Sequence, residues 1–315
     1  MEDLKFIMCH GSANRFVMID AISQPFSFEG VDVFVREVCA KCKSDGVLFL
    51  VKWGDDDMAM RMFNTDGSEA EMCGNGMRCI ARLADEEYLH SPKYMLYSGG
   101  QQYPIMCHEP LAEGVPAYGV EISIRTASDD FTLIDSTLSD SKFIAQQIEE
   151  LDDNLTFTYL NLGNPHIVTQ VESIDYDHLV RLGERVKQIK SVFPKGVNVS
   201  MMQHLEGNKI FVATFERGVG LTASCGTAMT ASSTTASLLG LCEWDADIEV
   251  RNRGGFVRCR THNRVDGLVT ELIGNATYEY YGRIHFDPTY SDMEIIVEEE
   301  CMCEQASWNS LVGTI

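Results

Sequence analysis

The chain has 315 residues, 45% of them apolar, which is enough for about two domains with substantial cores. Its formal net charge of −22 argues against nucleic acid and anionic membrane surfaces as partners. No run approaches the ~18 consecutive apolar residues of a membrane span, and residues 1–8 contain no long apolar core of a secretory signal. We therefore expect a cytoplasmic protein in which the eleven cysteines are reduced thiols.

The chain reads as two halves with the same order of parts. Each half starts with an asparagine-bearing loop, around Asn14 in the first half and around Asn164 in the second. Each half then continues through apolar segments to a cysteine loop, 59 residues after Asn14 and 61 residues after Asn164. The local sequences differ, so order and spacing alone indicate an ancient duplication.

Regular elements are predicted along both halves. Alternating or β-branched patterns predict strands over residues 47–52, 119–125, 209–215 and 267–273. Helical patterns follow the two cysteine loops, over residues 77–84 and 227–239. The second of these helices is rich in Ala, Ser and Thr, so it can be packed closely on all sides, and Gly240 is its stop signal.

Two further segments follow different patterns. Residues 176–190 are amphipathic and predict a surface helix with one buried face, formed by Leu179, Leu182, Val186 and Ile189. Residues 297–304 are strongly acidic, and we expect a tail that is disordered or folds only with a partner.

Two cysteines dominate the sequence because each opens a glycine-containing loop before a predicted helix. They are Cys73 in Glu71-Met-Cys-Gly-Asn-Gly76 and Cys225 in Ser224-Cys-Gly-Thr-Ala228. The positive end of a helix dipole is expected to lower the pKa of such a thiol, and the backbone N–H groups there can hold a carboxylate. One such site in each half predicts two thiols that flank one carbon, where one removes a proton and the other returns one.

With these motifs in view, residues 5–275 resemble the diaminopimelate epimerase family of cofactor-independent amino-acid racemases and epimerases. The block from Phe63 to Cys79 is close to the family signature. Four other motifs follow in the family's order: Gly11 to Phe16, Gly163 to His166, Val197 to Val199, and Glu216 to Gly218 with Cys225 to Thr227.

The resemblance implies an α+β fold of two pseudo-symmetric domains. Each domain would be a curled, barrel-like sheet of mixed or antiparallel strands around a central helix, with the active site in the cleft between the domains. We assign residues 1–120 with 273–315 to the half that carries Cys73, and residues 121–272 to the half that carries Cys225.

The same resemblance implies roles for individual residues. Cys73 and Cys225 would be the catalytic acid–base pair, with His166 and Glu216 in supporting positions. The N–H groups of four loop residues would bind the substrate α-carboxylate: Gly74, Asn75, Gly226 and Thr227. The remaining substrate-binding residues would be Asn14, Asn64, Asn164, Asn198, Glu216 and Arg217. The family implies an amino-acid substrate, no cofactor, no metal and a homodimer.

The chemistry supports this assignment independently. An amino-acid α-proton is very weakly acidic, so without an electron-sink cofactor the site itself must stabilise the carbanion. Two helix N-termini aimed at the α-carboxylate would do so as charge develops. The substrate must be held at both ends to keep its α-carbon between the sulfurs. Arg217 can pair with a distal carboxylate, and Glu216 with a distal ammonium.

Other interpretations remain open at this stage. Cys39 and Cys42 have the spacing of half a zinc site, but a second pair is absent, so we expect structural thiols. Arg15, Leu221 and Ala228 depart from the family pattern and leave substrate identity open. The leading hypothesis is an epimerase that converts LL- to meso-diaminopimelate in lysine and peptidoglycan-precursor biosynthesis. One alternative is a racemase of histidine or of a lanthionine-like amino acid. Another is a non-catalytic amino-acid-binding or redox-sensing protein whose two thiols form a disulfide on oxidation.

Overall fold

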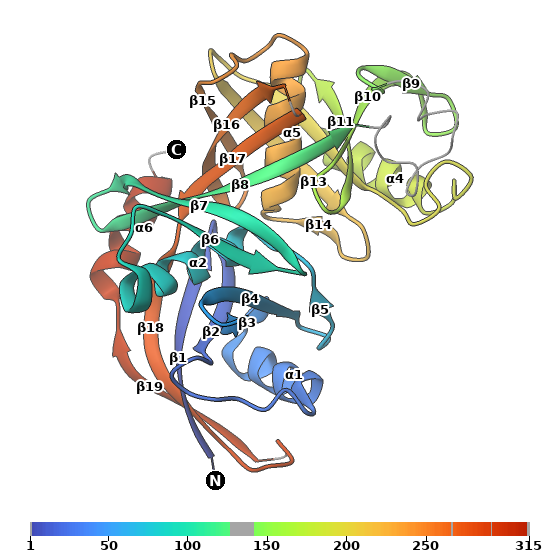
Figure 1. Ribbon diagram of the computed structural model, residues 1–315. Helices are drawn as coiled ribbons and strands as arrows, with labels where there is room; N and C mark the ends of the chain where they lie inside the picture. Colours follow the sequence, from blue (N-terminus) through green and yellow to red (C-terminus); the bar gives the residue numbers. More distant parts are fainter. Residues whose placement is uncertain (1, 127–141, 266, 291, 314–315) are drawn as a thin grey trace. The chain divides into compact units, whose positions relative to one another are not determined.

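The structure is a computed structural model that describes residues 2–126, 142–265, 267–290 and 292–313 (Figure 1). It is an α+β protein that divides into two compact units, one formed by residues 1–120 with 273–315 and the other by residues 121–272. The chain passes between the units within two strands, β8 (Val115–Thr126) and β17 (Gly267–Asn275).

The first unit is a mixed sheet with helices on both faces of its central strands. Its strands are β1 (Glu2–Gly11), β2 (Asn14–Asp20), β3 (Gly46–Trp53), β4 (Asp57–Asn64), β5 (Glu69–Ala70), β6 (Lys93–Ser98), β7 (Gln101–Ala112), β18 (Thr277–Phe286) and β19 (Met293–Glu300). Its helices are α1 (Val31–Cys42), α2 (Gly74–Ala84), the π-helix η1 (Asp85–Leu89) and α6 (Met302–Gly313). Both α1 and α2 pack on β2 and β3, which is why these strands are almost continuously apolar.

The second unit surrounds one central helix. Its strands are β9 (Gln146–Ile148), β10 (Asp152–Asn161), β11 (Pro165–Val171), β12 (Asn198–His204), β13 (Lys209–Glu216), β14 (Gly220–Thr222), β15 (Asp247–Asn252) and β16 (Gly255–Arg264). The central helix α5 (Gly226–Leu238) is buried from Gly226 to Ser237 and packs on β10, β11, β12, β13, β15 and β16. Its Ala, Ser and Thr side chains are small enough for this close approach on every side.

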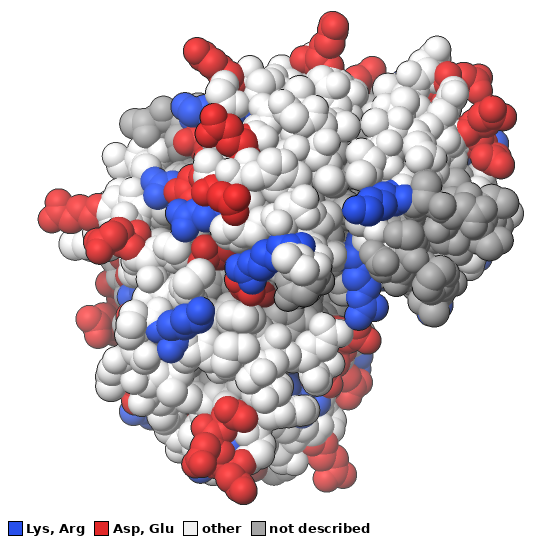
Figure 2. Space-filling view, turned by 45° about the horizontal axis from the view of Figure 1, so that its top comes forward, with Lys and Arg blue, Asp and Glu red and all other residues white. Residues whose placement is uncertain are grey.

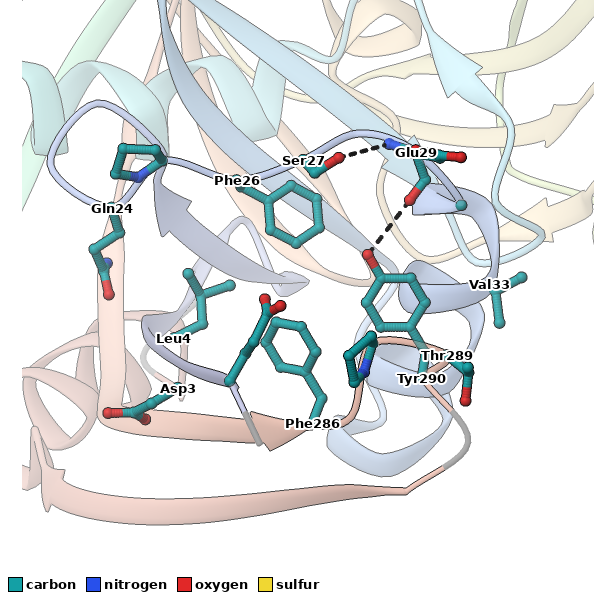
Figure 3. Close-up of a pocket in the computed structure, with 14 residues that line it drawn as sticks. Asp3, Leu4, Gln24, Phe26, Ser27, Glu29, Val33, Phe286, Thr289 and Tyr290 are labelled. Atoms are coloured by element: carbon teal, nitrogen blue, oxygen red, sulfur yellow. Dashed lines mark hydrogen bonds between the residues drawn. The ribbon is translucent and has the colours of Figure 1, made fainter.

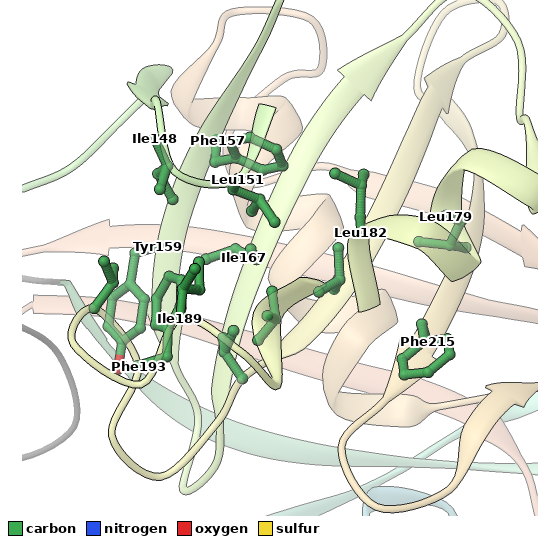
Figure 4. Close-up of a cluster of buried hydrophobic side chains, with 14 of the residues drawn as sticks. Ile148, Leu151, Phe157, Tyr159, Ile167, Leu179, Leu182, Ile189, Phe193 and Phe215 are labelled. Carbon is green, nitrogen blue, oxygen red and sulfur yellow. The ribbon is translucent and has the colours of Figure 1, made fainter. Parts of the chain in front are cut away.

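The outer helix of the second unit, α4 (Tyr176–Val186), covers β12 and β13. Leu179, Leu182 and Phe215 pack together with Phe157 and Phe193 in one apolar cluster beneath it (Figure 4). The predicted amphipathic helix is therefore confirmed, although it ends earlier than expected. Ile189 lies past the helix in a turn, yet it still packs in the cluster.

The two units repeat one strand order. In the first, β1 and β2 are antiparallel, β2 is parallel to β3 across α1, β3 is antiparallel to β4, and β4 is parallel to β6. The second unit has the same sequence of pairings. Strands β10 and β11 are antiparallel, β11 is parallel to β12 across α4, β12 is antiparallel to β13, and β13 is parallel to β15. The buried helices α2 and α5 occupy equivalent places along the chain. This repeat confirms the expected pseudo-symmetric fold, and the predicted strands and cysteine-loop helices are present.

The prediction of an acidic, disordered tail is wrong. Residues 293–300 form β19, which pairs antiparallel with β18, and residues 302–313 form α6. The Glu304 carboxylate accepts hydrogen bonds from Arg82 Nη1 and from the backbone N–H of Tyr278. Trp308 is only 5% exposed and lies against the His10 ring. The acidic composition led to the wrong prediction because Arg82, the basic partner of Glu304, is remote in sequence.

Acidic residues do not gather in one patch on the face drawn in Figure 2, where Lys and Arg side chains lie among Asp and Glu. Among the residues described, no helix combines the length and apolar character needed to cross a membrane.

The seating of α6 leads to a test of stability. Replacing Glu304 with Ala removes the carboxylate shared by Arg82 and Tyr278, and we expect a loss of about 2 kcal/mol because partly buried donors lose their acceptor. Urea denaturation measures this loss. The control is Glu298→Ala, whose exposed pair with Arg283 is worth at most about 1 kcal/mol. Equal effects of the two substitutions would contradict the anchoring of α6 by Glu304.

Candidate active site

Cys73 is the N-cap of α2. Its backbone is extended (φ −141°, ψ 108°), and its sulfur accepts a hydrogen bond from the N–H of Gly76 at 3.4 Å. A Cβ at Gly76 would lie 2.8 Å from a methyl group of Leu48 on β3. The first turn of α2 therefore lies directly on the sheet, and a larger residue at this position would force Leu48 to shift.

Two asparagines lie beside the Cys73 thiol. The Cys73 Sγ–H donates to Asn14 Oδ1 at 4.0 Å, and Asn75 Nδ2 donates to the same oxygen at 3.3 Å. Asn14 is in the hairpin between β1 and β2, and Asn75 is in the first turn of α2. The structure thus brings together three predicted site residues of the first unit. Asn64 instead closes the turn after β4, where Nδ2 donates to the carbonyl and hydroxyl of Ser68, and its substrate-binding role stays a prediction.

Cys225 is the N-cap of α5, with the same extended backbone (φ −132°, ψ 110°). Its sulfur lies 3.6 Å from Thr227 Oγ1. That hydroxyl in turn lies 3.1 Å from Nε2 of the fully buried His166 and accepts a hydrogen bond from Asn164 Nδ2 at 3.2 Å. The second unit therefore also surrounds its thiol with the predicted polar residues.

A second layer of predicted residues lies at the ends of β12 and β13. Asn198 Nδ2 lies 3.5 Å from His166 Nε2, and Asn198 Oδ1 accepts from the backbone N–H of Arg217 at 2.8 Å. The Arg217 side chain is exposed, and its Nη1 donates to the carbonyl of Lys195. Glu216 is half-buried and interacts with the Cys225 thiol.

Comparison with known proteins identifies the family of this chain. The family model described as diaminopimelate epimerase matches residues 6–110 and 158–279. A diaminopimelate epimerase of Clostridium acetobutylicum is 36% identical over 314 residues, which cover 98% of this chain and 93% of the relative. The chain belongs to the diaminopimelate epimerase family. This membership makes it an isomerase.

Solved structures show the same fold at low sequence identity. A phenazine biosynthesis protein of the PhzF family from Bacillus anthracis is 15% identical, with a TM-score of 0.65 over 91% of this chain and 100% of that chain. A hydroxyproline epimerase from Agrobacterium vitis is 13% identical, with a TM-score of 0.59 over 100% of this chain and 99% of that chain.

The expectation that the helix termini lower the thiol pKa values is wrong for both cysteines of this family member. Burial raises the pKa of Cys73 to about 11, although N–H groups of Gly76 and Asn75 and the charge of Arg78 oppose the shift. Burial also raises the pKa of Cys225 well above its ordinary value, and the negative charge of Glu216 raises it further. Loss of water around the sulfur therefore outweighs the favourable dipoles.

His166 is a neutral partner of Cys225. Burial, followed by the charge of Arg217, lowers the pKa of His166 to about 3. An imidazolium would have stabilised a thiolate, whereas the neutral ring can only orient Asn164 and Thr227 by hydrogen bonding.

Two further residues beside the Cys73 site were missed by the sequence analysis. Arg78 lies beneath it with no exposed surface, and Asp45 accepts hydrogen bonds from Asn14 Nδ2 and from the backbone of Arg15. Arg78 belongs to the signature block, but an arginine on a helix is ordinarily a surface residue. A single sequence contains no signal for its burial.

Other groups do not join the site. Cys39 and Cys42 are buried free thiols in α1, and in the described part of the chain no group of three or more His, Cys, Asp or Glu could hold a metal ion. A cavity of about 700 Å³ in the first unit has Phe26, Phe286 and Tyr290 in its wall (Figure 3), but the described residues that line it include none of the predicted site residues.

The charge of Glu216 gives a test of the Cys225 environment. Substitution Glu216→Gln removes the negative charge that disfavours the thiolate, so we expect a lower pKa of Cys225. Iodoacetamide alkylation of Cys225 at pH 9, read by peptide mass spectrometry, should accelerate by about tenfold for each unit of pKa. The control is Glu243→Gln, at an exposed position. An unchanged rate in Glu216→Gln would contradict the electrostatic role.

Proposed function

We propose that this chain is a diaminopimelate epimerase, which inverts the α-carbon of LL-diaminopimelate to give meso-diaminopimelate in lysine and peptidoglycan-precursor biosynthesis. The carrying observation is that a cysteine caps each of two topologically equivalent, buried helices. Family membership supports the substrate, because the curated relative from Clostridium acetobutylicum is a diaminopimelate epimerase.

The mechanism uses one thiolate and one thiol in each turnover. The thiolate of one cysteine removes the α-proton, and the thiol of the other donates a proton to the opposite face of the carbanion. One substrate must therefore meet both sulfurs. Because both thiols are neutral when the site is empty, the positively charged α-ammonium of the substrate would favour ionisation of the base.

Backbone dipoles would hold the substrate α-carboxylate. The first N–H groups of α2 and α5 have no partner within their own helix, and they belong to Gly74, Asn75, Gly226 and Thr227. Their interaction strengthens as the carbanion delocalises charge onto the carboxylate. This electrostatic stabilisation replaces a bound electron sink, so the reaction needs no pyridoxal phosphate.

The distal end of diaminopimelate carries a second carboxylate and a second ammonium. The exposed guanidinium of Arg217 suits the carboxylate, and Glu216 suits the ammonium. Arg15 had favoured another substrate because its charge is foreign to the family pattern. Both its Nε and its Nη2 donate to the Glu279 carboxylate, so that charge is compensated inside the first unit.

The homodimer and the cytoplasmic location stay predictions. Light scattering after size-exclusion chromatography measures the oligomeric state.

The two-thiol step is tested by Cys73→Ala and Cys225→Ala. Each variant should lose epimerisation by ~10²–10⁴-fold, which is the usual contribution of a positioned acid or base. The control is Cys303→Ala, at an exposed position of α6, which should retain activity.

Solvent deuterium separates two bases from one. In D₂O the meso product should carry deuterium at the inverted carbon, while LL substrate recovered early in the reaction should not. Deuterium in both isomers from the first turnovers would contradict the two-thiol mechanism, and retained activity in either alanine variant would do the same.

Substrate identity is tested at Arg217. Substitution Arg217→Ala should lower kcat/KM for diaminopimelate by about 10- to 100-fold, the range of a charge-assisted hydrogen bond. Arg217→Lys should lose less because the charge remains. The control is Arg181→Ala, on the exposed side of α4. Wild-type kinetics in Arg217→Ala, together with exchange in a monocarboxylate amino acid, would move the assignment to another racemase.

A further inference from the structure

Arg78 is buried completely on α2, just over one turn beyond the N-cap Cys73. A buried guanidinium is costly unless its donors are satisfied. Its Nη1 donates to the carbonyl of Gly74 at 3.2 Å, and its Nε donates to the carbonyl of Asn275 at 3.2 Å. Its Nη2 donates to Asn75 Oδ1 at 3.1 Å and to Ser12 Oγ at 3.2 Å. The guanidinium therefore binds the floor of the Cys73 loop directly.

The space for this guanidinium is built into two strands. A Cβ at Gly11, at the end of β1, would lie 2.8 Å from the carbonyl oxygen of Asn75 and 2.9 Å from Arg78 Nη2. A Cβ at Gly274, in β17, would lie 2.8 Å from Arg78 Nε. A larger residue at either position would force a neighbouring atom to shift, so these two glycines leave room for the guanidinium.

The hydrogen bonds form a directed chain from Arg78 to Asp45. Because Arg78 donates to Asn75 Oδ1, the amide nitrogen of Asn75 is the end that reaches Asn14 Oδ1, at 3.3 Å. Because Asp45 Oδ2 accepts from Asn14 Nδ2 at 2.9 Å, the oxygen of Asn14 is the end that faces the Cys73 thiol. A cation at one end and an anion at the other thus fix the orientation of both amides.

We propose that Arg78 is a positioning residue for Cys73, which orients Asn75 and Asn14 around the thiol and supplies a buried positive charge that favours its thiolate. This inference rests on the proposed function, in which Cys73 is one of the two bases. Arg78 does not touch the substrate, and it acts through the loop that it holds.

The charged surroundings of Cys73 support this role. The charge of Arg78 lowers the pKa of Cys73, whereas Cys79 on the same helix raises it. On β1, burial lowers the pKa of His10 to about 4, so this ring is neutral, and burial keeps Cys9 protonated by raising its pKa. On β2, Arg15 is paired with Glu279. Of these neighbours, Arg78 is the cation whose field acts on the sulfur.

The two thiols then differ in the sign of their charged neighbour. Cys225 lies beside the carboxylate of Glu216, which raises its pKa, and its histidine is neutral. In the ligand-free protein Cys73 should therefore ionise at a lower pH than Cys225. Both thiols are neutral at rest, and Cys73 is the one that we expect to ionise first.

The experiment titrates Cys73 without using activity. The rate of iodoacetamide alkylation of Cys73 is followed from pH 7 to 11 by peptide mass spectrometry in the wild type, Arg78→Met and Arg78→Lys. We expect Arg78→Met to slow alkylation at pH 9 by about tenfold, which corresponds to one unit of pKa. Arg78→Lys keeps the charge and should remain close to the wild type.

The matched control is Arg82→Met, one turn further along α2. Arg82 is also buried, but it pairs with Glu86 and Glu304 and is tied to α6 instead of the Cys73 loop. This control should lower the unfolding midpoint without changing the titration of Cys73. A wild-type titration in folded Arg78→Met would overturn the proposal, and an equal shift in Arg82→Met would reduce Arg78 to a packing role.

Asp45, at the other end of the hydrogen-bond chain from Arg78, supplies a second variant. This variant is expected to fold because Asp45 is exposed. Asp45→Ala frees the Asn14 amide, so we expect kcat to fall several-fold with KM nearly unchanged, while the Cys73 titration stays close to wild type. An unchanged kcat would overturn the proposal that this hydrogen-bond chain orients the amides around Cys73. If wild-type enzyme failed to epimerise diaminopimelate, the proposed function would fail, but the alkylation measurement would still decide the role of Arg78.

Discussion

The structure depends on one constraint, which is that each of the two cysteines is the N-cap of a helix buried along almost its whole length. Helices α2 and α5 can occupy these positions only because neighbouring strands approach them closely, as the contact between Gly76 and Leu48 shows. Burial of the helix fixes the first turn and points its unpaired N–H groups at one place. The same burial removes water from the sulfur and raises its pKa. Burial of the helix therefore accounts both for the orientation of the N–H groups and for the raised pKa of the thiol.

A thiol that is neutral in the empty site is compatible with the proposed two-thiol mechanism. A thiol that stays neutral in the empty site is protected from adventitious reaction, since the thiolate is the reactive form. In the proposed mechanism, the substrate ammonium would favour ionisation of the thiol when it binds. Water exclusion would also strengthen each dipole that faces a carbanion formed in this mechanism.

The repeated strand order gives both thiols the same backbone, but their side-chain surroundings differ. Arg78 lies beneath the Cys73 loop, whereas the surroundings of Cys225 contain the neutral ring of His166 and the carboxylate of Glu216. A symmetric scaffold therefore carries an asymmetric charge distribution. Such a difference fits a reaction whose two ends, an LL and a meso isomer, are not equivalent.

The sequence by itself determined the family and the local elements. Cys73 and Cys225 could be recognised because a cysteine-glycine loop before a helix is a local pattern, and the strands and the buried helix α5 follow from periodicity and small residues. Only the tertiary structure decided the ionisation of the thiols, because desolvation depends on what packs around the sulfur. It also decided the fate of the acidic C-terminal segment, since Arg82 and Tyr278, which bind Glu304, are remote in sequence. The burial of Arg78 could not be predicted from the sequence for the same reason, because the glycines that make room for it lie on β1 and β17.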